Sequence, residues 1–272
     1  MVENHSPVDY PVITSTQNSK VKWIRSLQSS SKARRKAGAF VVEGVRLAQE
    51  ALQAGWEAQL ALFTGGLNEQ GRAILDGFTA RGVPSEEVSE HVMLAASDTK
   101  TPQGILVVLS QHDLDLPAEL DFVFIPDSVR DPGNLGTMLR TAAAAGVGAV
   151  FLPPATVDLY SPKVVRAAMG AHFRLPVKPL TWQAIEAHLR SQRLQVYLAA
   201  ARAGSPYTES DLRGPLAIVT GGEAQGAGEQ ARRLATGMVH IPMPGQVESL
   251  NAAVAAAVLL FEVVRQRSIK SR

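Results

Sequence analysis

Three loop segments combine polar side chains with glycines in a pattern typical of ligand-binding loops. The first, residues 127–140, contains a Pro-Gly turn, then Asn134 as a candidate helix N-cap and Arg140 inside the following helix. A guanidinium is rarely buried without a partner, so we expect Arg140 to face a polar cleft. Asn134 and Arg140 are separated by about 120° around an ideal helix, so their spacing alone does not make them converge.

The second segment, residues 220–228 (TGGEAQGAG), follows an apolar run that predicts a strand. Gly221 and Gly222 at a strand end let backbone amides approach a ligand closely. Glu223 is either a functional carboxylate or a solvated loop residue. The segment that starts at Gly226 matches the dinucleotide pattern GxGxxA but begins several residues past the strand, which disfavours a Rossmann site, and no Gly-Lys-Ser/Thr follows, which excludes a P-loop.

The third segment, residues 240–251 (HIPMPGQVESLN), precedes the last helix of the chain. Its prolines and glycine prevent regular structure, and either Ser249 or Asn251 can cap the helix. The ten residues 252–261 are apolar on all sides, which predicts a helix that fills the core or forms a subunit interface. Ten residues are too few to cross a bilayer.

Composition excludes several other chemistries. The 272 residues contain no cysteine, so disulfides, zinc–thiolate sites, iron–sulfur clusters and thiol nucleophiles are excluded. The six histidines match no metal-ligand spacing, and neither a Ser-His-Asp order nor a pair of catalytic carboxylates emerges. The start of the chain lacks the apolar core of a signal peptide, and no apolar run reaches the ~18 residues of a membrane span. We therefore expect a soluble protein without a metal, in a reducing compartment.

Positive charge is concentrated near the N-terminus. Residues 20–36 contain seven basic residues and no acidic one, a charge asymmetry that favours an anionic partner such as RNA. The alternative is a solvated, partly disordered tail, although Trp23 and Ile24 favour some order. Because only 6% of residues are aromatic, we expect contacts to phosphate rather than base stacking. The candidate RNA-binding side chains are those of Lys20, Lys22, Arg25, Lys32, Arg34, Arg35 and Lys36.

The hydrophobic pattern predicts two α/β domains. In the second half, short apolar strands at 122–125, 149–152, 196–199, 216–219 and 238–241 alternate with helices at 135–145, 162–169, 182–192 and 229–236. This alternation predicts a parallel sheet covered on both faces, whose ligands bind at the carboxyl ends of its strands. In the first half, the pattern predicts strands at 39–42, 60–63 and 105–109 and helices at 44–54, 67–79 and 86–96. The expected divisions are a basic extension or helix (1–36), an RNA-binding domain (37–112), a linker (113–120) and a catalytic domain (121–272).

Taken together, the three loops resemble the SpoU/TrmH family of RNA ribose methyltransferases, within the SPOUT superfamily. The resemblance covers residues 121–267 and rests on DPGNLGTMLRTA (131–142), TGGEAQG (220–226) and IPMPGQVESLNAAVA (241–255). The first half, with FVVEGVRLAQEAL (40–52) and TPQG (101–104), resembles the RNA-binding domain that precedes the catalytic domain in many members. That domain is itself similar to certain ribosomal proteins.

The resemblance implies S-adenosylmethionine as methyl donor and a ribose 2′-hydroxyl, here of 23S rRNA, as acceptor. It also implies a cytoplasmic homodimer and a deep trefoil knot near the C-terminus. Gly222, where many relatives carry alanine or serine, and Pro244, where a small residue is usual, depart from the family pattern. Carried over by position, the catalytic residues are Asn134, Arg140, Glu223, Ser249 and Asn251. The cofactor-binding residues are Thr220, Gly221, Gly222, Ile241, Met243, Leu250 and Asn251.

Methyl transfer from a sulfonium requires oxygen, carbon and sulfur in line, and positioning supplies much of its rate. An arginine with a pKa above ~12 is a poor base, so our hypothesis makes Arg140 a phosphate clamp that orients the ribose. Asn134 would then bind the sugar or hold Arg140, while Ser249 and Asn251 would order the cofactor loop. The alternatives are a non-catalytic RNA-binding or ribosome-assembly protein on the same fold and a dinucleotide-dependent oxidoreductase.

Overall fold

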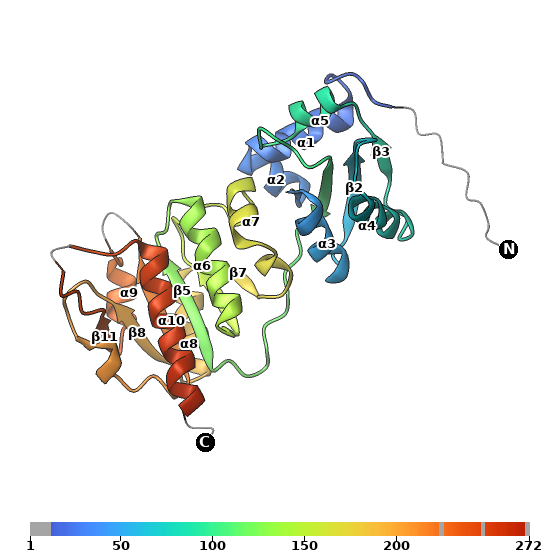
Figure 1. Ribbon diagram of the computed structural model, residues 1–272. Coiled ribbons are helices and arrows are strands. Elements are labelled where there is room, and N and C mark those ends of the chain that lie inside the picture. Colours follow the sequence, from blue (N-terminus) through green and yellow to red (C-terminus); the bar gives the residue numbers. More distant parts are fainter. Residues whose placement is uncertain (1–11, 223–225, 246–247, 270–272) are drawn as a thin grey trace. The chain divides into compact units, whose positions relative to one another are not determined.

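The computed structural model describes residues 12–222, 226–245 and 248–269. The chain divides after Gln111 into two compact units, which we call unit 1 and unit 2 (Figure 1). Each unit has its own sheet and its own buried core.

Unit 1 is built on a four-stranded mixed sheet with the order β1-β4-β2-β3. Strands β1 and β2 pair antiparallel with β4, and β3 pairs parallel with β2. Strand β4 is apolar and almost fully buried along its length, as expected for a central strand. The strands are β1 (Ala39–Glu43), β2 (Ala58–Phe63), β3 (Ser85–Glu87) and β4 (Ile105–Ser110).

Within the described part of unit 1, five helices accompany this sheet, and the basic segment forms the first two of them. Asn18 caps α1, which buries Val21, Ile24 and Leu27 in the core of unit 1. The segment predicted as an extension or helix therefore includes a helix that packs into this unit, because its apolar residues recur at helical spacing. The helices are α1 (Ser19–Ser29), α2 (Ser31–Ala37), α3 (Val45–Gln53), α4 (Glu69–Thr79) and α5 (Glu90–Ala96).

The helix predicted over residues 86–96 begins later than expected. Residues 85–87 form β3, which pairs with the end of β2, and the helix starts only after Ser89. The Ser89 hydroxyl accepts a hydrogen bond from the Val92 amide at 3.4 Å and so caps α5. A three-residue strand is too short to show a period in the sequence, so the acidic residues resembled a first helical turn.

Unit 2 is built on a seven-stranded, all-parallel sheet with the order β7-β6-β5-β10-β8-β11-β9. The predicted α/β class with a parallel sheet is confirmed, and the trefoil knot stays a prediction. The two edge strands, β7 and β9, were not predicted, because they have only three and two residues. The strands are β5 (Phe122–Asp127), β6 (Ala149–Leu152), β7 (Val177–Pro179), β8 (Gln195–Ala199), β9 (Ser205–Pro206), β10 (Leu216–Gly221) and β11 (Gly237–His240).

Helices cover both faces of this sheet. Alternate residues of β5 enter different cores: Phe122 and Phe124 pack with one set of helices, and Val123 and Ile125 pack with the other. The first set is α6 (Pro132–Ala144), α7 (Pro162–Ala168) and α10 (Ala252–Ile269), and the second is α8 (Trp182–Ser191) and α9 (Glu229–Leu234). Two single turns, η1 (Ala171–Phe173) and η2 (Tyr207–Glu209), complete the unit. Among the described residues, no helix is both long and apolar enough to cross a membrane.

Buried His172 gives unit 2 a pH-dependent stability. Its Nε2 lies 2.9 Å from the Leu159 carbonyl, and burial lowers the pKa of His172 to about 4. The unfolded chain takes up this proton near pH 6.5, so we expect stability to fall as the pH drops from about 6.5 towards 4, by up to ~3 kcal/mol. Urea unfolding of wild type and His172→Gln at pH 7 and pH 5 tests this: the wild type should lose more stability than the variant, and equal losses would contradict the assignment.

Candidate active site

A cavity of about 520 Å³ lies at the carboxyl ends of three neighbouring strands of unit 2. Its walls include residues 199–201 after β8, residues 220–222 at the end of β10, and Val239 and Ile241 at the end of β11. Ala255 and Leu259 of α10 add apolar surface. The cavity therefore lies where the strand pattern predicted a ligand.

The cavity brings together residues from all parts of the predicted cofactor set. Every one of the seven lines it: Thr220, Gly221, Gly222, Ile241, Met243, Leu250 and Asn251. Ser249, predicted as catalytic, lines it too. Glu223 lies outside the described residues.

The two glycines at the end of β10 lie in a crowded turn. A Cβ atom on Gly221 would lie closer than 3.0 Å to backbone atoms of Gly226 and Ala227. A Cβ atom on Gly222 would equally collide with the backbone carbonyl of Ser128. Because backbone cannot rotate away as a side chain does, both positions require glycine in this chain. The Ser128 carbonyl gives a physical reason for glycine at position 222.

Asn251 joins the starts of two helices that are distant in sequence. Its Oδ1 accepts hydrogen bonds from the Ala253 and Val254 amides, at 2.9 and 3.2 Å, and so caps α10. Its Nδ2 donates to Oδ1 of Asn134 at 3.0 Å, across 117 residues. The structure thus brings Asn134 beside the cavity through Asn251.

The predicted capping role of Asn134 is wrong, because Asp131 caps α6 instead. Pro132 occupies the first turn of the helix, and Oδ1 of Asp131 accepts a hydrogen bond from the Asn134 amide at 2.8 Å. This hydrogen bond and the nearby Lys163 ammonium lower the pKa of Asp131. The Asn134 side chain is consequently left to bond with Asn251 rather than with its own helix.

Asp127 is a functional candidate that the sequence analysis did not single out. Its carboxylate is 2% exposed at the end of β5, and Oδ2 accepts a hydrogen bond from the Gly228 amide at 2.7 Å. Ser128 Oγ donates to Oδ1 at 2.9 Å. Asp127 thus ties the loop after β5 to the glycine-rich loop after β10. The sequence did offer a signal for Asp127, because a charged residue ends an otherwise apolar strand.

The same contact excludes the dinucleotide interpretation. In a dinucleotide fold, the amides of the glycine turn bind a pyrophosphate. Here the Gly228 amide already donates to the protein's own carboxylate, whose charge would repel phosphate. The match of residues 226–231 to GxGxxA is therefore coincidental.

Arg140 is not brought into the cavity within a single chain. It is exposed on α6, whereas its neighbours Met138, Leu139 and Ala142 are buried. Across residues 12–222, 226–245 and 248–269, no ion pair to Arg140 is found. The polar cleft expected around Arg140 stays a prediction, and among the described residues its side chain is exposed.

Two of the predicted basic side chains are held by the protein. Arg34 is 5% exposed and donates to the Leu27 carbonyl at 2.5 Å, so it fastens α2 to α1 and cannot extend to a phosphate. Sequence patterning could not separate it from its exposed neighbours. Lys20 forms an ion pair with Glu86. Lys22, Arg25, Lys32, Arg35 and Lys36 are exposed.

Comparison with known proteins matches each unit to a known family of domains. The SpoU rRNA Methylase family matches residues 121–261, and the MRM3-like substrate binding domain matches residues 18–107. The chain belongs to the SpoU rRNA methylase family. The family and the enzyme class that the sequence motifs predicted, an RNA ribose 2′-O-methyltransferase, are thereby confirmed.

Similar proteins match this SpoU methylase over nearly the whole chain. The 23S rRNA (guanosine(2553)-2′-O)-methyltransferase RlmP of Bacillus subtilis is 35% identical, over 92% of this chain and 98% of its own. The AdoMet-bound rRNA methyltransferase from Sinorhizobium meliloti has a TM-score of 0.85 at 32% identity, covering 94% of this chain and 97% of its own. The SpoU methyltransferase AviRb from Streptomyces viridochromogenes, solved in complex with AdoMet, has a TM-score of 0.84 at 27% identity, covering 93% of this chain and 99% of its own.

Proposed function

We propose that this SpoU methylase transfers the methyl group of S-adenosylmethionine to a ribose 2′-hydroxyl of large-subunit rRNA. The observation that carries the proposal is the cavity at the carboxyl ends of β8, β10 and β11, which all seven predicted cofactor residues line. RlmP of Bacillus subtilis and the Sinorhizobium meliloti enzyme, which match over nearly the whole chain, are rRNA methyltransferases by name, which supports rRNA as the substrate.

The chemistry of the cavity fits S-adenosylmethionine. Thr220 is 2% exposed, and within the described ranges its Oγ1 has no hydrogen-bond partner, although it lines the cavity. Backbone groups of the glycine turn can bind the polar atoms of the cofactor, while Ile241 and Leu259 offer apolar surface to its adenine and methylene groups. When bound, the cofactor supplies a methyl group made electrophilic by the sulfonium.

The residues around the cavity orient the acceptor rather than activate it by strong base chemistry. We assign Asn251 and Asn134 to a rigid amide pair at the entrance of the cavity. Arg140 binds an RNA phosphate as a two-pronged donor and so fixes the ribose. A guanidinium group is a poor base, so the 2′-hydroxyl proton leaves to water or phosphate instead. Ser249 orders the cofactor loop.

Two measurements test this function. Purified chain and radiolabelled S-adenosylmethionine should methylate an unmodified 23S rRNA transcript, and the ribose methylation map of cells that lack the protein should lose one site. The non-catalytic alternative predicts that the protein binds RNA but does not bind S-adenosylmethionine, so that a calorimetric titration with the cofactor gives no binding heat. Binding of the cofactor without methylation of any RNA would contradict the proposed reaction.

The exposed basic residues of α2 should contribute to RNA affinity through phosphate pairing. Removing one cation that pairs with a phosphate flattens the slope of log affinity against log salt by about 0.7 for single-stranded RNA, so replacing Lys32, Arg35 and Lys36 with alanine should flatten it by about 2. Filter binding at several salt concentrations measures the slope. Arg34 is left intact because it holds α2 in place. An unchanged slope would mean that these residues are solvated and do not contact RNA phosphates.

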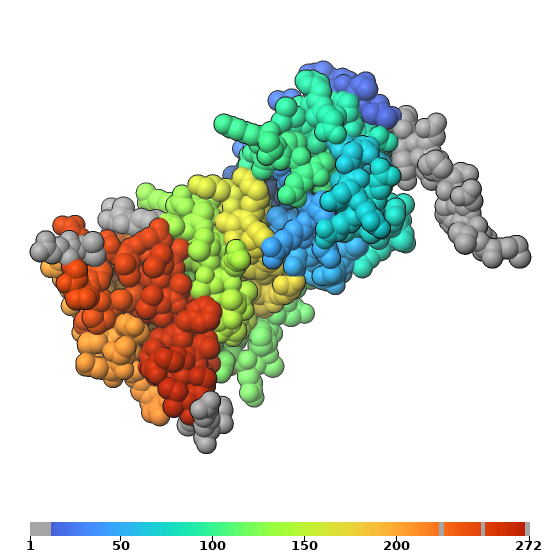
Figure 2. Space-filling view, in the orientation of Figure 1, coloured from blue at the N-terminus to red at the C-terminus, as the bar shows by residue number. Residues whose placement is uncertain are grey.

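We also propose a homodimer through α10. Helix α10, drawn in red in Figure 2, buries one set of residues in unit 2 and exposes Val254 and Phe261, which lie two helical turns apart. Large apolar side chains that are exposed on one helix are typical of an interaction surface. Val254→Asp with Phe261→Asp should convert a dimer to a monomer in sedimentation experiments, while Leu94→Asp, on equally exposed α5, should not. A monomeric wild type would contradict the proposal. A cytoplasmic location is part of the same proposal, supported by the similarity to a bacterial rRNA methyltransferase.

A further inference from the structure

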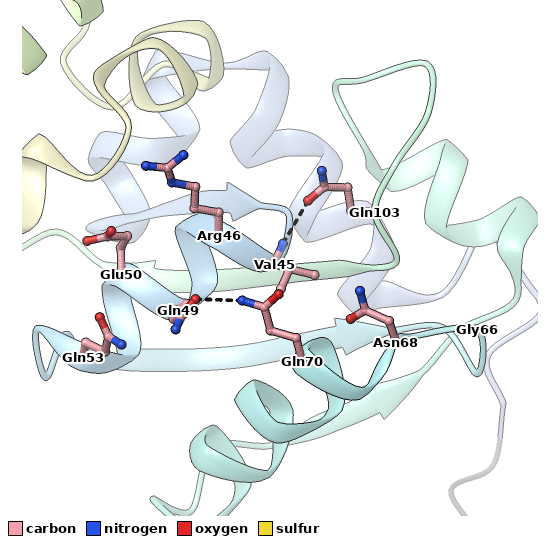
Figure 3. Close-up of a pocket in the computed structure, with 9 residues that line it drawn as sticks. All are labelled: Val45, Arg46, Gln49, Glu50, Gln53, Gly66, Asn68, Gln70 and Gln103. Atoms are coloured by element: carbon pink, nitrogen blue, oxygen red, sulfur yellow. Dashed lines mark hydrogen bonds between the residues drawn. The ribbon is translucent and has the colours of Figure 1, made fainter.

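A second large cavity, of about 750 Å³, lies within unit 1 (Figure 3). It is bounded by α3, by the turn that leads into α4, and by the segment that precedes β4. Side-chain amides dominate its lining, and no aromatic residue contributes to it. The amides belong to Gln49, Gln53, Asn68, Gln70 and Gln103.

Local backbone geometry holds one wall of this amide cleft in place. Gly44 has a φ of +94°, and a Cβ atom there would lie 2.6 Å from Gln103 Oε1. Glycine therefore lets Gln103 reach the first turn of α3, where Oε1 accepts a hydrogen bond from the Val45 amide at 3.1 Å. The Glu43 carboxylate accepts from the Asp98 amide at 3.1 Å and from the Ser97 hydroxyl at 2.5 Å, which fixes the segment that carries Gln103.

The amides of the cleft leave both donors and acceptors available. Gln70 Nε2 donates to Gln49 Oε1 at 3.0 Å, which occupies only one hydrogen of one amide and one lone pair of the other (Figure 3). Asn68 Oδ1 accepts from the Gly71 amide at 2.8 Å, so its NH₂ group remains a donor. A mixed row of this kind matches the edge of a nucleobase, where donors and acceptors are adjacent, better than it matches an ion.

Two charged side chains narrow the ligand class. Arg46 lines the cleft with an exposed guanidinium, and no ion pair to it exists within the part of the chain that the structure describes. Glu50, one helical turn further along α3, also lines the cleft. A carboxylate beside the amides repels a free phosphate, which favours a base as the group that the amides contact. Arg46 can pair with the phosphate attached to that base.

We propose that this cleft binds one unpaired nucleotide of the RNA substrate, with the amides on the base edge and Arg46 on the phosphate. The proposal rests on the proposed function for the class of its ligand. Sequence-specific recognition of RNA acts mainly on unpaired bases whose edges are accessible. The cleft would therefore select the RNA, while the cavity of unit 2 performs the transfer.

The test uses the full chain and an unmodified 23S rRNA transcript. Gln49→Ala with Gln70→Ala removes base contacts without a change of charge and spares Gln103 and Asn68, which cap helices. We expect RNA affinity to fall about tenfold, which corresponds to the loss of one bidentate hydrogen-bonded pair with a base. The slope of log affinity against log salt should not change. In dimethyl sulfate footprinting, one base protected by the wild type should become reactive. Arg46→Ala should flatten the salt slope by about 0.7.

Matched controls separate the possible outcomes. Gln17→Ala and Arg81→Ala remove exposed side chains of the same types outside the cleft and should bind RNA as the wild type does. If wild type methylates the transcript and the Gln49/Gln70 variant binds and protects it equally well, the cleft proposal is overturned while the proposed function stands. If wild type binds but never methylates, loss of the protected base in the variant still supports the cleft. If wild type binds no RNA, both proposals fail.

Discussion

Replacing Gly221 with alanine is expected to weaken binding of S-adenosylmethionine by about 10- to 100-fold. The new Cβ would lie closer than 3.0 Å to backbone atoms of Gly226 and Ala227, so the turn must open. Forcing one extra methyl group into a packed site costs ~1–3 kcal/mol, and this turn forms a wall of the cavity. Isothermal titration of the purified variant with the cofactor measures the loss.

Gly214→Ala provides the matched control for this change. Among the described residues, nothing lies within 4 Å of a Cβ atom at Gly214, which is outside the cavity, so this variant should bind the cofactor like wild type. The thermal unfolding of Gly221→Ala and its RNA affinity show whether the fold survives. Wild-type affinity for the cofactor in Gly221→Ala would mean that this turn does not shape the binding site.

Replacing Arg140 with alanine should lower the rate of RNA methylation at saturating RNA by about 10²–10³-fold, as expected for the loss of a charged donor that acts in the transition state. Arg140→Lys should recover only a small part of the loss, because an ammonium group cannot form the two parallel hydrogen bonds of a guanidinium. Since Arg140 does not line the cavity, affinity for S-adenosylmethionine should stay unchanged. Single-turnover methylation at saturating RNA measures the effect.

The control for Arg140 is Arg190→Ala, which removes an equally exposed charge from α8, where Arg190 pairs with Glu186. Its turnover should match that of the wild type. Near-normal turnover of Arg140→Lys at saturating RNA would contradict the clamp role, and lost cofactor affinity in Arg140→Ala would instead indicate a structural role.

The strand pattern predicted the place of the cavity because it depends on a general property of parallel sheets. Apolar runs ending at residues 199, 219 and 241 had to place their following loops at one sheet edge. The resemblance to SpoU methylases then selected individual residues from those loops. By contrast, local rules misplaced the start of α6, because both Asp131 and Asn134 are good caps and Pro132 decides between them.

Contacts between distant segments were beyond sequence reasoning. Nothing in a single sequence indicates that Asn134 meets Asn251 or that Asp127 meets Gly228. Burial of one basic residue among seven was equally hidden, because Arg34 differs from its neighbours only in the carbonyl that it reaches. The amide cleft of unit 1 consists of scattered glutamines without a motif, so only the fold reveals it.

Asn251 makes the site intolerant of piecemeal change. One side chain caps α10, lines the cavity and bonds to Asn134, so no substitution alters only one of these functions. Single variants at positions 134 and 251 should therefore each lose most of the contribution that the Asn134–Asn251 hydrogen bond makes to the site. The double variant should lose little more than either single variant. In evolutionary terms, the two positions are expected to drift together or not at all.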